Sequence, residues 1–169
     1  MKIKRREFLY IAAFLFLSIL CFLERSGYHN LSTLAKEAAT WPLLFLFDLL
    51  FTVCMVMSYG GMLKKEYRIL LCIALMLPSI PNFPGMGSLH LFGAYCGLIA
   101  SCLIALLFLW RYQQKYLMPY IALLFLLTVL YSGEFVVTSL MEWLYLSTDL
   151  LLAWYAGEKN CIFDLFSVK

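Results

Sequence analysis

The sequence predicts an all-α protein, a single integral membrane domain over residues 1–169 that forms a bundle of six transmembrane helices. Three observations lead to this prediction. First, 64% of the residues are apolar and 14% are charged, whereas soluble domains are typically about half apolar and about a quarter charged. Second, the apolar residues gather in six runs separated by short polar segments. Third, lysine and arginine are distributed very unequally between alternate segments.

The six spans can be justified in chain order. The first follows a basic N-terminus, and we interpret it as a retained anchor because no small-residue cleavage site follows it. The second begins at Trp41 and Pro42, where proline suits the first helical turn because its missing N–H would be unpaired there anyway. Prolines within residues 78–84 end the third span as a regular helix, and Ser132 and Gly133 separate the last two. The expected bounds are 8–23, 42–62, 67–80, 89–110, 116–131 and 135–156.

The basic residues orient this predicted bundle. With the N-terminus inside, eleven lysines and arginines fall on the inner side, and only Arg25 and Lys36 fall outside. This asymmetry follows the positive-inside rule. Five spans would place the last basic residues outside, so the count also favours six spans with both termini cytoplasmic.

The sequence also predicts the structure of two segments outside the spans. In the long outer segment, residues 34–39 are expected to form a short helix along the membrane surface. The tail at residues 162–166 is expected to be a disordered or docking end, and the alternative is that it lies on the inner membrane surface.

Several functional classes lack support in the sequence. It contains no Walker loop, no dinucleotide-binding fingerprint and no paired Cys-x-x-Cys, so we predict no cofactor. The net charge of +3 is small and dispersed, which argues against a nucleic-acid partner. His29, His90 and Glu134 lack the spacing of metal ligands, so we predict no metal site.

Asp48, Glu142 and Asp149 are ionisable residues inside predicted spans, where insertion of each costs roughly 2.5–3.5 kcal/mol. From a rise of about 1.5 Å per residue, Asp48 lies roughly 9 Å and Glu142 roughly 10 Å from the outer ends of their spans. His90 enters its span from the same side. We therefore predict that Asp48, His90 and Glu142 line a polar cavity in the outer half of the membrane, which binds a lipid headgroup or small ligand.

Other interpretations of these residues stay open. Buried carboxyl groups can simply hydrogen-bond neighbouring helices. Thr138, Glu142, Tyr145 and Asp149 share one helical face, so Glu142 and Asp149 are candidates for a proton relay in a small transporter, although no inverted repeat is visible. A lipid-modifying enzyme would use His90 as its general base. No nucleophile is evident for it, so we predict no catalytic residue and favour a non-catalytic protein or a partner subunit.

Gly93, Gly97 and Ser101 recur every four residues on the fourth predicted span. Small residues at this spacing allow another helix to approach closely. The sequence therefore predicts helix packing at this stripe, either within the bundle or at the interface of a homodimer or with a membrane protein partner.

Three segments, residues 28–34, 82–94 and 139–143, together resemble the FRAG/DRAM/SFK-type six-helix membrane family and related bacterial six-span proteins of unknown function. His90 and Glu142 are the positions that match its motifs. The resemblance implies a non-enzymatic membrane protein, which in eukaryotes is linked to lipid organisation or membrane trafficking, with membrane lipids as partners. The short third outer loop and the lack of cysteines in outer loops fit a bacterial plasma-membrane member better.

Overall fold

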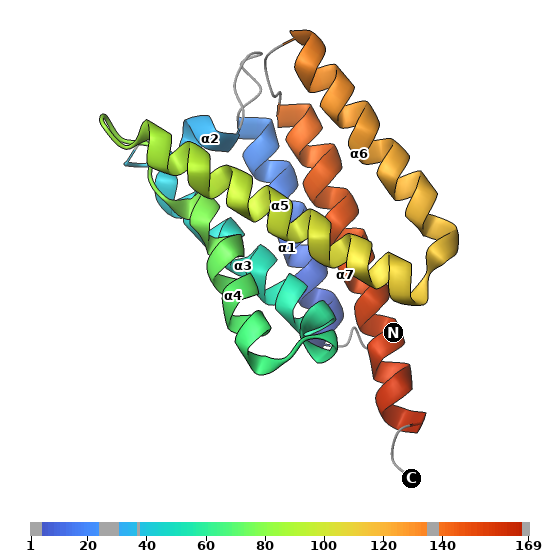
Figure 1. Ribbon diagram of the computed structural model, residues 1–169. Helices are drawn as coiled ribbons and strands as arrows, with labels where there is room; N and C mark the ends of the chain where they lie inside the picture. Colours follow the sequence, from blue (N-terminus) through green and yellow to red (C-terminus); the bar gives the residue numbers. More distant parts are fainter. Residues whose placement is uncertain (1–4, 24–30, 37, 135–138, 167–169) are drawn as a thin grey trace.

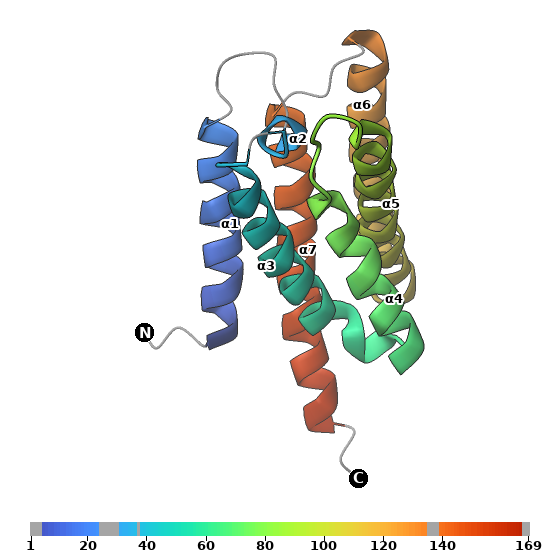
Figure 2. The same ribbon diagram turned by 90° about the vertical axis from the view of Figure 1, so that its left-hand side faces the viewer.

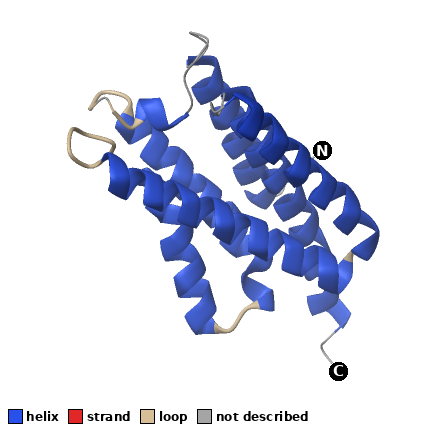
Figure 3. Cartoon of the chain, turned by 45° about the horizontal axis from the view of Figure 1, so that its top comes forward, coloured by secondary structure: helices blue, strands red, loops and turns tan. Residues whose placement is uncertain are grey.

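The chain folds as a set of packed helices, and its computed structural model describes residues 5–23, 31–36, 38–134 and 139–166. These residues contain helices, turns and loops but no strand (Figures 1 and 3). The predicted all-α class is therefore confirmed for the described part of the chain. The elements are α1 (Arg5–Leu23), α2 (Leu31–Leu34), α3 (Trp41–Tyr59), η1 (Gly60–Met62), α4 (Lys65–Met76), η2 (Leu77–Ser79), α5 (Gly87–Tyr112), α6 (Gln114–Glu134) and α7 (Ser139–Phe166).

The long helices follow the six predicted spans in order, but their lengths differ. Among the described residues, Trp41–Met62 and Gly87–Tyr112 are the two helices long and apolar enough to qualify as membrane spans by length and composition. Glu7–Phe22 and Gln114–Val129 are shorter apolar stretches. Helix α4 has 12 residues, or about 18 Å at about 1.5 Å per residue, against a hydrocarbon core of about 30 Å. Helix geometry alone therefore does not establish six spans.

Helices α1, α3 and α7 pack against one another, and α4 lies against α3 and α5 (Figure 2). Helix α6 leaves the end of α5 at a sharp turn and packs mainly on that helix (Figure 1). On α1, Ala13, Leu17 and Leu20 are fully buried at helical spacing and face the other two members of this group. On α3, Phe47 and Met55 are buried in the same core. The α1/α3/α7 group is therefore the structural centre of the molecule.

The segment after α4 is broken by prolines, and its exposed backbone groups find partners in other elements. Trp41 Nε1 donates a hydrogen bond to the Ser79 carbonyl at 2.7 Å. His90 Nδ1 donates to the Ile80 carbonyl at 2.6 Å, and the Asn82 N–H donates to the Ala35 carbonyl at 2.9 Å. Proline removes helical N–H donors and so leaves carbonyls to be satisfied otherwise. These three bonds hold the broken segment between α2, α3 and α5.

The stripe of small residues on α5 packs on this broken segment. A Cβ atom added at Gly93 would lie 2.9 Å from the carbonyl carbon of Leu77, and one at Gly97 would lie 2.9 Å from Cδ of Pro78. Both distances are shorter than real Cβ contacts. Ser101 is buried one turn further along. In this chain the stripe is therefore occupied by an internal contact between α5 and η2.

Two local expectations are wrong. The short helix forms at Leu31–Leu34 rather than at residues 34–39, because Glu142 accepts the Leu31 N–H at its start and Thr40 Oγ1 donates to the Leu34 carbonyl at its end. Glu37 lies outside the described residues. The tail at residues 162–166 is helical rather than disordered, because α7 continues to Phe166, beyond the predicted limit of the sixth span at residue 156, and docking by this end stays a prediction.

The close packing of α5 on η2 predicts a specific sensitivity to added volume. Replacing Gly93 by alanine is expected to cost about 1–3 kcal/mol of stability, because the new methyl group overlaps backbone atoms that cannot rotate away. Thermal unfolding of the purified protein in detergent measures this loss. Gly61→Ala is the matched control, since no atom lies within 4 Å of a Cβ added there. Equal unfolding temperatures for the two variants would contradict the assigned contact.

Candidate functional site

A cavity of about 760 Å³ lies between α3, α5, α6 and α7, and α2 closes one of its ends. Its volume falls within the range of about 300–1,000 Å³ that is typical of ligand sites. Most of its wall is apolar, with Phe47, Phe51 and Leu98 among the lining residues. Asp48, His90 and Glu142 also line it. The structure therefore brings the three predicted ligand-binding residues into one cavity, from three different helices.

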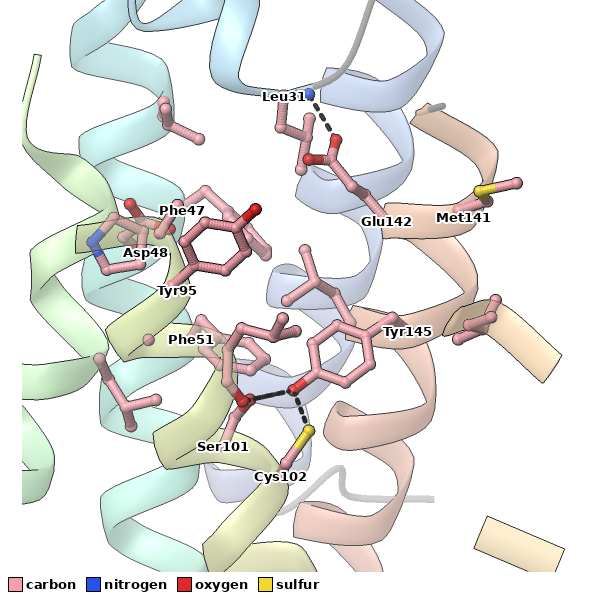
Figure 4. A pocket seen from close by; sticks show the side chains of 18 of the residues that line it. Leu31, Phe47, Asp48, Phe51, Tyr95, Ser101, Cys102, Met141, Glu142 and Tyr145 are labelled. Carbon is pink, nitrogen blue, oxygen red and sulfur yellow. Dashed lines mark hydrogen bonds between the residues drawn. The ribbon is translucent and has the colours of Figure 1, made fainter. Parts of the chain in front are cut away.

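Asp48 is placed in the cavity by the buried face of α3. Leu44, Phe47 and Phe51 are buried at helical spacing around it, so the same face that packs on the bundle also carries the carboxyl group inward. Asp48 is 7% exposed. Its Oδ2 atom is buried and has no hydrogen-bond partner among the described residues. The side chains of Asp48 and Glu142 lie on two sides of one space (Figure 4).

His90 begins the second turn of α5 and is 3% exposed. Its Nδ1 atom bonds to the Ile80 carbonyl at 2.6 Å. A carbonyl oxygen can only accept, so Nδ1 must carry the proton of this bond. The other ring nitrogen, Nε2, is buried and finds no partner in the described part of the chain. His90 therefore has one nitrogen that supports the fold and one that is left to the cavity.

Glu142 lies on α7 and ties that helix to α2. Its carboxylate accepts the backbone N–H of Leu31 at 2.5 Å (Figure 4). This N–H begins a short helix and has no partner within it. Glu142 therefore forms a hydrogen bond to a neighbouring helix, which is the structural role that the sequence left open. It also lies in the cavity wall.

Asp149 does not line the cavity. It lies about two turns further along α7 and is fully buried. Tyr120 Oη on α6 donates a hydrogen bond to its Oδ1 atom at 2.8 Å, while its Oδ2 atom has no partner in the described ranges. The two carboxyl groups of the proposed relay therefore occupy different surroundings, with Glu142 at the cavity and Asp149 in the packed interior.

Tyr145 lies between these two acids on the same face of α7 and forms the floor of the cavity. Its hydroxyl is hydrogen-bonded with Ser101 Oγ, lies 3.3 Å from Cys102 Sγ and donates to the Leu98 carbonyl at 3.1 Å. The helical spacing from Glu142 places Tyr145 on this face, but nothing in the sequence pairs it with Ser101. Tyr95 and Thr128 also line the cavity, and sequence reasoning missed both because neither is charged.

The remaining candidates cannot be placed here, because Thr138, His29 and the side chain of Glu134 lie outside the described residues. Within the described ranges, no group of three or more His, Cys, Asp or Glu side chains is arranged to hold a metal ion. No protein-family model, curated protein or solved structure matches the chain. The site is therefore argued from its geometry alone, and the family resemblance stays a prediction.

The double role of His90 predicts a difference between two substitutions. His90→Leu is expected to cost about 1–3 kcal/mol, because the Ile80 carbonyl loses its donor in a buried place. His90→Asn is expected to lose clearly less, since the asparagine amide nitrogen takes the position of Nδ1. Thermal unfolding in detergent compares the two variants with the wild type. If asparagine proves as damaging as leucine, the bond to Ile80 does not carry the structural role assigned here.

Proposed function

We propose that this chain is a non-catalytic integral membrane protein with six spans, whose cavity binds a lipid or a similar amphiphile. One observation carries this proposal: a cavity with mostly apolar walls has Asp48, His90 and Glu142 on its lining. Ligand sites typically combine an apolar surface with a few polar groups that orient the ligand. An amphiphile has the same division between a chain and a headgroup.

The outward faces of the helices support a membrane environment. On α1, the apolar residues of the outer face are between 48% and 65% exposed and recur at helical spacing: Phe8, Ile11, Leu15, Ile19 and Phe22. Helices α4, α5 and α6 also expose large apolar side chains along their length. Apolar surfaces of this extent are rare on soluble monomers, whereas lipid chains are as apolar as leucine and need no such covering.

The short helix α4 is compatible with a membrane span because of how its continuation is held. Irregular backbone at membrane depth is tolerated where it is buried in protein or lines a cavity. The Ser79 and Ile80 carbonyls are bonded by side chains of α3 and α5, and Pro78 lines the cavity. Helix α4 and the segment after it can thus cross together without leaving these carbonyls in hydrocarbon.

The positions of the basic residues support the orientation with both termini in the cytoplasm. The two described chain ends, the α3–α4 connection and the α5–α6 connection lie toward the end of the molecule opposite α2 (Figures 1 and 2). Lys64 lies in the first connection, and the helix ends beside the two connections carry Lys65, Arg68, Arg111 and Lys115. On the α2 side, Lys36 is the single basic residue within the described ranges. This asymmetry is what the positive-inside rule requires of a cytoplasmic face.

The cavity has an access route on the side of the bundle. Three of its lining residues on α5, Leu91, Tyr95 and Leu98, are 54%, 46% and 41% exposed. Thr128, which lines it from α6, is also exposed. Helices α5 and α6 diverge from their shared turn toward the α2 end (Figure 1). A ligand dissolved in the bilayer can therefore enter between α5 and α6 without passing through water.

Filling the cavity tests the proposed binding function. Ala94 lines the cavity, whereas Leu103 lies on the same helix, is 61% exposed and does not line it. Ala94→Trp is expected to reduce the amount of co-purified lipid or amphiphile by more than about tenfold, because the larger side chain fills the cavity. A tenfold loss corresponds to about 1.4 kcal/mol of binding free energy. Leu103→Trp, the matched control, should retain it. Native mass spectrometry measures the bound molecule, and identical spectra for the two variants would contradict the proposal.

The orientation makes a separate prediction. A cysteine introduced at exposed Lys36 should react with a membrane-impermeant maleimide on intact cells, because the α2 end faces outward. A cysteine at exposed Lys65 should react only after the cells are opened. The labelling of each is read against the unsubstituted protein, which reports the native cysteines. If only the cysteine at position 65 reacts on intact cells, the proposed orientation is wrong and the opposite one holds.

A further inference from the structure

Two buried polar atoms on residues that line the cavity have no hydrogen-bond partner among the described residues. Asp48 Oδ2 and His90 Nε2 belong to side chains that are more than nine-tenths buried and line the cavity, and neither atom has a partner among the described residues. A buried polar atom without a partner costs on the order of 1–3 kcal/mol. Such atoms are usually satisfied by water or by a ligand. A ligand with N–H donors would satisfy His90 Nε2 and an ionised Asp48 together.

The state of His90 follows from its other nitrogen. Because Nδ1 donates to the Ile80 carbonyl, the neutral ring has its free lone pair on Nε2. In this tautomer Nε2 is an acceptor without a partner among the described residues, on a side chain that lines the cavity.

The charge of the site points in the same direction. Asp48 and Glu142 both line the cavity, and neither lysine nor arginine is among the described lining residues. Ser101 and Tyr145, which can donate, are bonded with each other at the floor. An anionic headgroup would meet two carboxyl groups and no cationic side chain. A cation with N–H groups would favour the ionised form of these carboxyl groups and donate hydrogen bonds to them.

A metal ion fits less well than an ammonium group. Metal ligands must approach to about 2.0–2.2 Å, and the described His, Cys, Asp and Glu side chains form no group arranged for this. Hydrogen bonds from N–H donors to their acceptors span about 2.7–3.2 Å. An ammonium group can therefore bond to acceptors that lie too far apart to ligate one metal ion. A quaternary ammonium has no N–H and would leave Asp48 Oδ2 and His90 Nε2 unsatisfied.

We propose that the occupant of the cavity is an amphiphile with an N–H-bearing ammonium head, bound by Asp48, His90 and Glu142, with its apolar chain between α5 and α6. This inference rests on the proposed binding function and names its ligand class. Asp48 Oδ2 and His90 Nε2 accept hydrogen bonds from the ammonium. Glu142 retains its bond to Leu31 and contributes charge.

The test compares amphiphiles that share one chain and differ in the head. Wild-type protein in phosphatidylcholine nanodiscs is titrated with decylammonium, decyltrimethylammonium and decanoate, and binding is followed by thermal stabilisation and native mass spectrometry. Decylammonium is expected to bind at least about tenfold more tightly than the other two. Equal or tighter binding of decanoate or of the trimethyl compound would overturn the assigned head.

Variants locate the head within the protein. Asp48→Asn keeps the shape of the side chain and removes its charge, and it should weaken decylammonium binding about tenfold or more. His90→Asn keeps a donor for Ile80 and removes the Nε2 acceptor, so it should also weaken binding even if the aspartate variant fails to fold. Glu158→Gln, an exposed position on α7 away from the cavity, is the control. Unchanged affinity in both cavity variants would overturn the proposal.

The same experiment separates this inference from the proposed function. If decanoate binds in preference, and Ala94→Trp expels it, the binding cavity stands and the ammonium head is wrong. If Ala94→Trp affects none of the three probes, the binding cavity itself is wrong. Lipid analysis of protein taken from its own membrane then identifies the source of the amine. An aminophospholipid lost in Asp48→Asn indicates a membrane lipid, whereas decylammonium binding without such a lipid indicates a free amine.

Discussion

The arrangement of this molecule depends on the need to satisfy every buried polar group from within the protein. In the proposed membrane setting no water is available to bond an exposed carbonyl or N–H, so the proline break after α4 would depend on the bonds that Trp41 and His90 donate to it. The start of α2 depends on Glu142 in the same way. In the interior, Tyr10 pairs with Ser58 and Tyr120 with Asp149. Polar side chains thus mark the places where helices are joined.

This constraint also explains why the candidate site is ordered. His90 cannot turn its ring without breaking its bond to Ile80, and Glu142 cannot swing away without releasing Leu31. The structural bonds therefore fix the directions in which the remaining acceptor atoms point. A site held by bonds of this kind is ready before its ligand arrives, which lowers the entropic cost of binding. The structural and the binding interpretations of these residues are therefore compatible rather than exclusive.

The helices and three of the residues that line the cavity could both be predicted from the sequence, but for different reasons. Long apolar runs and the prolines at residues 78–84 are local signals, so the order of the helices and the break after α4 could be predicted. Depth along each span then placed Asp48, His90 and Glu142 at similar levels. The bonds of Glu142 to Leu31 and of Tyr145 to Ser101 join residues 111 and 44 positions apart. Such pairings follow from tertiary packing, which local periodicity does not encode, and the same long-range bond moved the short helix to Leu31–Leu34.

The wall that α6 supplies to the cavity has a consequence for selectivity. The polar end of the cavity is built on α3, α5 and α7, whereas its far wall is supplied by Leu124, Leu127 and Thr128 of a helix that packs mainly on α5. Apolar contacts with this wall place few directional demands on what they touch, whereas the hydrogen-bonding groups at the polar end require partners in fixed positions. The protein should therefore discriminate sharply between chemical groups at one end of a bound molecule and tolerate a range of chain lengths and degrees of unsaturation at the other.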